Sequence, residues 1–230
     1  MHKLYHHSMS VPSRYARLIL GEYGQQFQLV EETPWSRKPD FLKLNPAGTL
    51  PVLATGDGRA VCGGTVVGEF IDETVGAMMR EKRLMPENSF DRAEIRRLVD
   101  WFLIKFEAEA LHYIVGERVF KQMKRSEEGG GAPDSSRIRA GRNNLKNHLK
   151  YIGWLAGNRN WLGGTRLSHA DMAAASGISV LDYLGEIDWD SESAARDWYA
   201  RIKSRPSFRP LLADKVGGIP PVSHYADLDF

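Results

Sequence analysis

The segment Asn45-Pro46-Ala47-Gly48-Thr49-Leu50-Pro51-Val52-Leu53 is the most informative stretch of this chain for its fold. A proline that leads directly into an apolar run cannot sit in the middle of a sheet, because it lacks the N–H donor. Pro51 is therefore expected in a turn or at the start of a strand. A cis Leu50-Pro51 bond would turn the flanking backbone outward, where a ligand's peptide groups could pair with it. An ordinary turn before an edge strand is the alternative.

Short apolar runs and amphipathic stretches surround this segment. We expect strands at 3–7, 27–30, 52–54 and 60–62, and helices that begin at Pro12, at Phe41 and at Val66. Thr55-Gly56-Asp57-Gly58 is a strong turn signal between the last two strands. The order β-α-β-α-β-β-α combines a parallel crossover with a terminal hairpin, which predicts a small α/β domain.

The remainder of the chain has helical patterning. Apolar residues recur at three-to-four spacing in a long helix expected over 90–124, and a Gly-rich tip at 127–136 precedes a second long helix at about 136–155. Ser168 and Asp171 form a Ser-x-x-Asp pattern that predicts a structural cap for the next helix. We therefore expect an α/β domain at 1–76, a linker at 77–89, an all-helical domain at 90–216 and a tail at 217–230.

Composition excludes several classes of function. The net charge is +2 over 230 residues, which is too balanced to indicate nucleic-acid binding. Apolar runs are shorter than the ~20 residues needed to cross a bilayer, so no membrane insertion is expected. A single cysteine suits a reducing cytoplasm, and a secretory signal is not visible. The seven histidines do not cluster at ligand spacing, so no metal site is expected.

Four motifs in this order resemble the glutathione S-transferase family across nearly the whole chain. They are Leu4-Tyr5 with Ser10 to Arg14, Asn45 to Leu53, Ser168 to Asp171, and Trp198-Tyr199 with Arg205 to Phe208. The resemblance implies a thioredoxin-like N-terminal domain followed by an all-helical C-terminal domain. It also implies that Ser10 would stabilise a glutathione thiolate if the protein is an active enzyme, although Ser10 could equally be a helix cap.

The expected glutathione cleft departs from the family's pattern. The resemblance implies that Leu50, next to Pro51, pairs by backbone with the cysteinyl unit, and that an acidic or amide residue followed by serine holds the γ-glutamyl end. Gly63-Gly64 stands where that pair should be. Two lost hydrogen bonds to charged groups cost about 3–6 kcal/mol, which weakens binding by about 10²–10⁴-fold. We therefore expect weak or lost glutathione binding and no other cofactor.

The C-terminal tail suggests a different activity. Tyr225 and Phe230 are aromatic residues of the kind found at interfaces, although a terminus that packs back or stays disordered is the alternative. The tail, the segment 34–39 and the lost anchor resemble a bacterial division-associated member of this fold that binds FtsZ filaments. That resemblance implies a homodimer at the division site, and we expect partner contacts from Trp35, Arg118, Lys121, Lys124, Arg125, Tyr225, Asp227 and Phe230.

Three functions therefore compete. The leading hypothesis is a non-catalytic homodimer that binds FtsZ filaments through the tail and the helical domain. The alternative is an active glutathione transferase that conjugates glutathione to small electrophiles with Ser10. A weaker third option is a chaperone or redox adaptor with Cys62 as its reactive thiol, but a buried, inert thiol in the strand at 60–62 is favoured.

Overall fold

The N-terminal part of the protein is built on a four-stranded mixed sheet. In the computed structural model, which describes residues 2–228, the strand order is β2-β1-β3-β4. β1 (His2–His6) pairs in parallel with β2 (Phe27–Glu31) and antiparallel with β3 (Val52–Ala54), and β3 pairs antiparallel with β4 (Ala60–Cys62). The predicted β-α-β-α-β-β-α order and fold class are confirmed.

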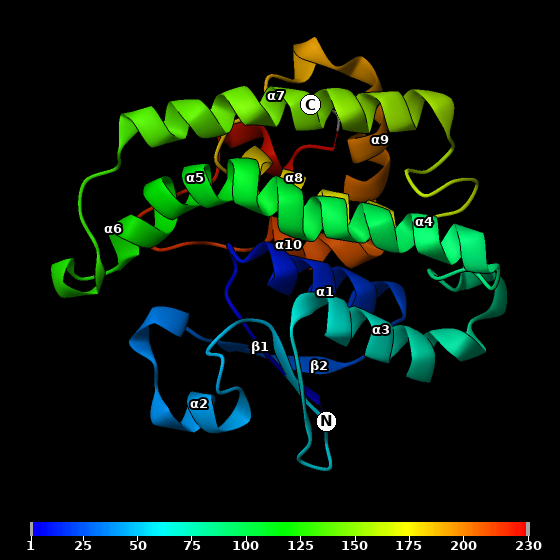
Figure 1. The fold of residues 1–230 in the computed structure, drawn as a ribbon, viewed down its shortest axis with the longest axis horizontal. Coiled ribbons are helices and arrows are strands. Elements are labelled where there is room, and N and C mark those ends of the chain that lie inside the picture. The colour runs from blue at the N-terminus through cyan, green and yellow to red at the C-terminus, as the bar shows by residue number, and fades with distance from the viewer. Residues whose placement is uncertain (1, 229–230) are drawn as a thin grey trace.

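Helices cover both faces of this sheet. α1 (Val11–Glu22) and α3 (Gly64–Thr74) lie between the sheet and the helical part of the molecule, and α2 (Pro39–Leu44) lies on the other side (Figure 1). Proline at the second position of α1 suits a helical first turn, where a backbone N–H has no intrahelical partner. On the α2 side, Phe41 packs in a small core with neighbouring residues of the sheet and of the proline loop.

The helical part begins after two short 3-10 turns, Gly76–Met78 and Arg80–Lys82, which lie in the expected linker. α4 (Ser89–Asp100) is followed directly by π-helical turns, by α5 (His112–Val115) and by α6 (Lys121–Met123), close to the helix expected over 90–124. The π-helical turns, which the residue spacing did not indicate, lie at Trp101–Lys105, Glu107–Leu111 and Gly116–Phe120.

Four further helices complete the fold. They are α7 (Ser135–Asn158), α8 (His169–Tyr183), α9 (Ser193–Lys203) and α10 (Arg209–Leu212). Every residue of α8 is buried, so this helix is the centre of the helical part. Asp171 accepts hydrogen bonds from the backbone N–H and the hydroxyl of Ser168 at 3.0 and 2.9 Å, and Trp198 Nε1 donates to it at 3.0 Å. These contacts confirm the structural role predicted for the capping pattern.

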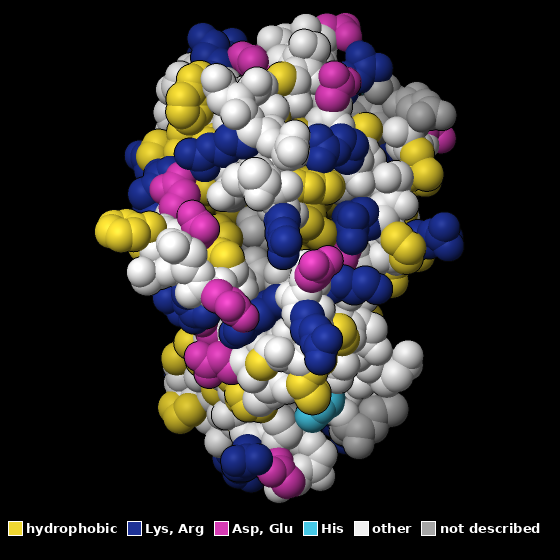
Figure 2. Space-filling view, turned by 90° about the vertical axis from the view of Figure 1, so that its right-hand side faces the viewer, with side chains coloured by type: hydrophobic (Ala, Val, Ile, Leu, Met, Phe, Trp, Pro, Cys, Tyr) yellow, Lys and Arg dark blue, Asp and Glu magenta, His cyan; other side chains and the backbone are white. Residues whose placement is uncertain are grey.

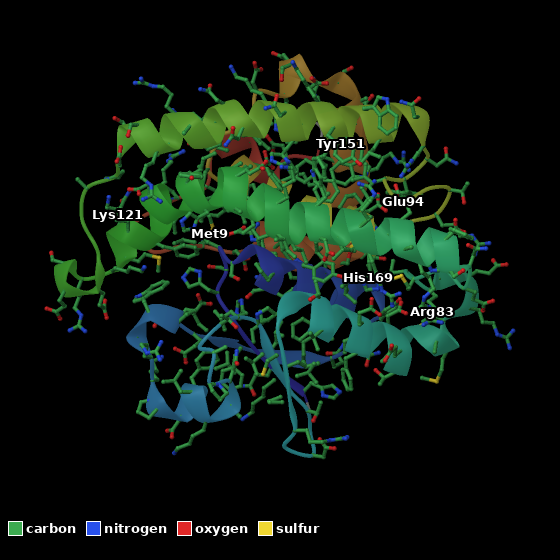
Figure 3. The ribbon with its side chains drawn as sticks, viewed as in Figure 1. Met9, Arg83, Glu94, Lys121, Tyr151 and His169 are labelled. Atoms are coloured by element: carbon green, nitrogen blue, oxygen red, sulfur yellow. The ribbon has the colours of Figure 1, made fainter. Side chains whose placement is uncertain are left out.

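A buried polar network joins the two parts of the molecule. Its centre is His169, labelled in Figure 3. Tyr15 Oη lies 2.7 Å from His169 Nδ1, and His169 Nε2 lies 3.3 Å from Asp72 Oδ1. Asp72 also accepts hydrogen bonds from Tyr23 Oη at 2.6 Å and from Arg83 Nε at 2.8 Å. Because one apolar core extends from α1 through α8, the two parts pack as one body around this network.

Candidate functional site

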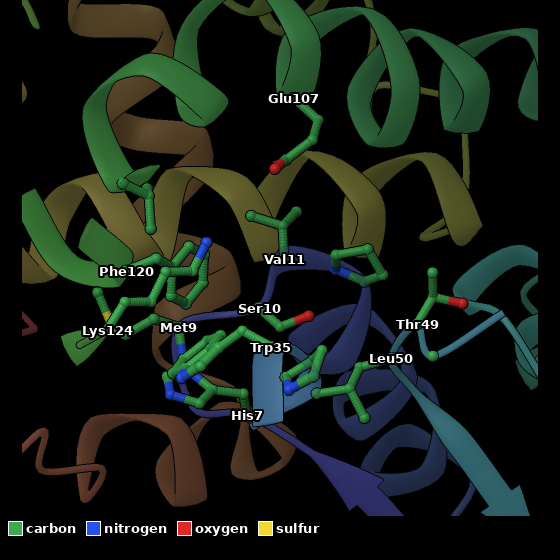
Figure 4. Close-up of a pocket in the computed structure, with 14 residues that line it drawn as sticks. His7, Met9, Ser10, Val11, Trp35, Thr49, Leu50, Glu107, Phe120 and Lys124 are labelled. Carbon is green, nitrogen blue, oxygen red and sulfur yellow. The ribbon is translucent and has the colours of Figure 1, made fainter. Parts of the chain in front are cut away.

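A cavity of about 290 Å³ lies where the sheet, the proline loop and the long helix meet (Figure 4). One wall comes from the start of α1 and from the loop before Pro51, and the other comes from α5 and the π-helical turns that flank it. The volume is at the small end of the range for ligand sites. Its lining is mainly apolar and includes His7, Met9, Ser10, Val11, Pro12, Pro34, Trp35, Gly48, Thr49, Leu50, Glu107, Val115, Phe120 and Lys124.

Ser10 caps α1 and also lines the cavity. Its Oγ accepts a hydrogen bond from the backbone N–H of Ser13 at 3.4 Å, which is long for a cap. The hydroxyl is therefore a helix cap, one of the two roles that the sequence left open, and it also lies at the cavity. Its catalytic role stays a prediction.

The proline loop has the conformation that the sequence allowed. The Leu50-Pro51 peptide bond is cis, and Leu50 is buried against the cavity. Asn45 holds the loop in place, because its side-chain amide donates to Thr49 O at 2.8 Å and its Oδ1 accepts from Ala47 N at 3.2 Å. The loop also meets the start of α3, where Gly63 N donates to the carbonyl of Pro51 at 2.9 Å.

The glycine pair begins α3 without any side chain that could hold a ligand. Gly63 is the N-cap and has φ 95°, a conformation that L-residues rarely adopt. A Cβ atom placed on Gly64 would lie 2.9 Å from Cβ of Pro12, so Pro12 occupies the space that a serine would need. Pro51, Gly63 and Gly64 do not line the cavity, whereas Pro12 does.

Three aromatic rings close one end of the cavity. The ring centroids of His7 and Trp35 are 5.7 Å apart, those of His7 and Phe120 are 5.3 Å apart, and those of Trp35 and Phe120 are 5.6 Å apart. The Lys124 ammonium lies 5.8 Å from the centroid of the Trp35 ring. Trp35 therefore lines the cavity, and the partner contact expected of it stays a proposal.

Two titratable groups of the cavity have shifted pKa values. Burial, aided by the charge of Arg14, lowers the pKa of His7 to about 4, and Met9 N donates to its Nδ1 at 3.1 Å. Burial raises the pKa of Glu107 to about 7. Within the described residues, Glu107 Oε2 is buried without a hydrogen-bond partner.

Sequence reasoning missed His7, Glu107 and Phe120 as cavity residues. A signal for Glu107 was present, because Leu103, Glu107 and Ala110 follow one another at helical spacing and place a carboxylate on the buried stripe of the helix. Glu107 and Phe120 both lie in π-helical turns, a distortion that often marks functional sites.

The basic residues expected to contact a partner are largely engaged within the molecule. Arg118 donates to Glu186 and, at 2.9 Å, to the carbonyl of Leu184. Lys121 pairs with Glu117 at 2.8 Å, and exposed Arg125 pairs with Glu127 and Glu128. On the face drawn in Figure 2, positive and negative side chains are likewise interspersed. The positive charges of Arg118, Lys121 and Arg125 are thus partly neutralised by acidic neighbours.

The tail packs back onto the helical part, and this corrects the view of Tyr225 as an exposed anchor. Tyr225 is 1% exposed; its hydroxyl donates to Leu211 O at 3.1 Å and accepts from Arg14 Nη1 at 3.0 Å. A phenol ring with both bonds satisfied belongs to the core. Asp227 is exposed, and Phe230 lies outside the described residues.

Three further features of the chain were considered from the sequence: the thiol of Cys62, metal binding and membrane spans. Cys62 is half-buried, its Sγ lies 3.6 Å from Leu44 O, and burial raises the pKa of the thiol, which disfavours the reactive thiolate. Between residues 2 and 228, no cluster of histidine, cysteine and acidic residues could hold a metal ion. None of the helices described there is long and apolar enough to span a membrane.

Comparison with known proteins establishes the family. A model of the glutathione S-transferase N-terminal domain matches residues 10–74. The chain is 40% identical over 230 residues to a protein from Caulobacter vibrioides, with 99% of this chain and 97% of that protein covered. With the fold described above, these matches show that the chain belongs to the glutathione S-transferase family.

The similar proteins include an FtsZ-localized protein and proteins named as glutathione S-transferases. The Caulobacter vibrioides relative is FtsZ-localized protein A. The solved structure of FzlA from C. crescentus superimposes with a TM-score of 0.93 at 40% identity and covers 100% of this chain and 99% of that one. A glutathione S-transferase from Sinorhizobium meliloti 1021 superimposes with a TM-score of 0.98 at 58% identity and covers all of both chains.

Proposed function

We propose that this protein is a non-catalytic member of the family that binds FtsZ filaments as a homodimer in the cytoplasm, at the division site. The observation that carries the proposal is the glycine pair at the start of α3. Gly63 and Gly64 leave the γ-glutamyl end of glutathione without side-chain partners, and Pro12 occupies the place of the second side chain. Similarity over the full chain to FtsZ-localized protein A supports the partner.

The proposed contact surface lies at the C-terminal end of α8. Arg118 donates to the carbonyl of Leu184, and the tail joins the same place, where Val222 N donates to the carbonyl of Tyr183 at 3.1 Å. The proposed contact also includes two exposed charged residues, Asp227 of the tail and Arg125. Charges of both signs specify orientation and association rate more than raw affinity.

Co-pelleting with assembled FtsZ tests this surface. Removing residues 220–230 would also remove the buried Tyr225, so charge reversal at Asp227 is the cleaner change. We expect Asp227→Lys, alone or with Arg125→Glu, to reduce the fraction of protein that pellets by several-fold. Asp57→Lys, the same charge change in the exposed turn between β3 and β4, is the matched control. Equal pelleting of all variants would remove this surface from the proposal.

The homodimer would use exposed apolar side chains of the long helix. Phe90 is 84% exposed and Ile104 is 61% exposed, and we infer that a second copy of the chain covers them. We expect Phe90→Asp to shift the molar mass measured by light scattering from dimer toward monomer. Lys150→Asp, on the exposed side of α7, serves as the control and should leave the molar mass unchanged. A wild-type protein with the molar mass of a monomer would contradict the dimer.

The second candidate function is glutathione conjugation with Ser10, favoured by the position of that side chain at the cavity. Glutathione titration by calorimetry separates the two functions. The missing clamp predicts an affinity about 10²–10⁴-fold below the micromolar affinity usual for the enzymes. Micromolar binding, together with conjugation that falls about 10²-fold in Ser10→Ala, would support the enzyme instead.

A further inference from the structure

The cavity contains one acidic group that lacks a partner. Within the described part of the chain, Glu107 Oε2 is buried and accepts no hydrogen bond, although a buried carboxylate is costly unless a cation or donor pairs with it. The neighbouring acid Glu109 contrasts with it, because Glu109 binds both Lys105 and His148. Figure 4 shows the Glu107 carboxyl directed from the long helix toward Val11, into the cavity.

The opposite end of the cavity is formed by three aromatic rings that pack against one another at tilted and edge-on angles. His7, Trp35 and Phe120 lie with their ring centroids 5.3–5.7 Å apart, and His7 is neutral because burial holds its pKa at about 4. Aromatic faces attract cations, and the Lys124 ammonium already lies 5.8 Å from the Trp35 centroid. The volume of about 290 Å³ restricts a ligand to small-molecule size.

We propose that this cavity binds a small organic amine, whose protonated amino group pairs with Glu107 and whose apolar body lies against Trp35 and Phe120. A carboxylate placed near Glu107 would meet a like charge in a desolvated site, so this end of the cavity favours a cationic group. It also disfavours neutral apolar compounds, which would leave the Glu107 carboxyl unpaired. This activity is independent of FtsZ binding.

Three probes of the same size and shape test the proposal by calorimetry at pH 8. Phenethylamine carries the cation, 2-phenylethanol is its neutral analogue, and phenylacetate carries an anion. A charge-assisted hydrogen bond predicts that wild-type protein binds the amine about 10- to 100-fold more tightly than the alcohol, with phenylacetate the weakest. Equal or tighter binding of the alcohol or of phenylacetate by wild-type protein would overturn the proposal, and this comparison requires no variant.

Glu107→Gln then assigns the preference to one residue. The amide keeps the shape of the side chain and removes its charge, so the advantage of phenethylamine over 2-phenylethanol should fall to within about threefold. Glu109→Gln, two positions along the same helix, should keep the full preference, because Glu109 binds Lys105 and His148 and does not line the cavity. A preference that survives Glu107→Gln, or that Glu109→Gln abolishes, would exclude Glu107 as the recognition group.

Discussion

At the residue scale, Arg14 shows how the tail is held. Its guanidinium is fully buried and donates to Ser8 O at 2.6 Å, to Ser179 Oγ at 2.9 Å and to Tyr225 Oη at 3.0 Å. One side chain of α1 thus binds the segment after β1, the buried helix α8 and the C-terminal tail. A buried cation depends on each of these acceptors, because an unmet bond to a charged group is costly.

Tyr225→Phe removes one acceptor from Arg14 and leaves the ring in place. We expect the free energy of unfolding to fall by about 1.5–3 kcal/mol, the range for a hydrogen bond to a charged group. Urea unfolding monitored by circular dichroism measures it. Tyr113→Phe, in a half-buried ring that lies under the Arg137 guanidinium, is the control and should change stability by less than about 0.5 kcal/mol. Equal effects of the two changes would contradict this role of the phenol.

Gly64→Ser tests whether the lost clamp can be restored by one residue. Because the new Cβ would lie 2.9 Å from Cβ of Pro12, we expect a loss of about 1–3 kcal/mol in stability and no gain in glutathione affinity. Unfolding and glutathione titration of the same preparation measure both quantities. Gly157→Ser is a control, since a Cβ there meets nothing within 4 Å. A stable variant with tighter glutathione binding would refute the steric argument.

At the element scale, α8 depends on the acid at its start. Asp171 accepts bonds from Ser168, Trp198 Nε1 and, at 2.8 Å, Leu162 N, all in a buried setting. Asp171→Ala leaves these donors without an acceptor, so we expect a loss of more than about 3 kcal/mol. Asp134→Ala removes the N-cap residue of α7, whose hydrogen bonds to Ser136 and Arg137 are exposed, and should cost only about 1 kcal/mol. If urea unfolding gives similar losses for Asp171→Ala and Asp134→Ala, burial does not make the acid at the start of α8 the more important of the two.

How far the sequence predicted each element depends on where its determinants lie. The strands, the hairpin turn around Asp57 and the capping pattern at Ser168 were predictable because neighbouring residues determine them. The π-helical turns at 101–120 were not predictable, because the apolar residues in this segment recur at ordinary helical spacing. The carboxyl of Glu107 and the ring of Phe120 meet Ser10 only after the two parts of the molecule pack together, so the cavity had no local signature beyond a single acid on an apolar stripe.

At the scale of the whole molecule, His6 and His7 couple folding to pH. Burial is the main cause that lowers both pKa values from 6.5 to about 4, with contributions from Arg17 for His6 and from Arg14 for His7. This holds although Glu31 Oε2 lies 3.3 Å from His6 Nε2. Between pH 6.5 and 4 these two side chains therefore bind more protons in the unfolded chain than in the folded protein, whereas Glu107, with its pKa raised to about 7, acts in the opposite direction.

We accordingly expect the contribution of the two histidines to the free energy of unfolding to be complete above pH 6.5 and to fall steadily toward pH 4. A urea series at pH 7, 6, 5 and 4.5 measures the slope, and His6→Asn should flatten it. Asp72, whose pKa is about 2, contributes to stability above pH 3.8 and loses that contribution only at lower pH. The pH range over which Asp72 acts therefore lies below that of the histidines. The same dependence of stability on pH in the wild type and in His6→Asn would contradict the neutral, buried state of His6.

The sequence by itself indicated the fold, the proline loop and the glycine pair in the place expected for a glutathione clamp, because each signal is a short run of neighbouring residues. Only the tertiary structure decided that Tyr225 belongs to the core, that Pro12 occupies the space beside Gly64, and that the basic residues of the long helix are paired with acids. Those outcomes depend on which distant side chains meet when the apolar core closes. Burial and charge pairing are properties of that packing and not of the local sequence.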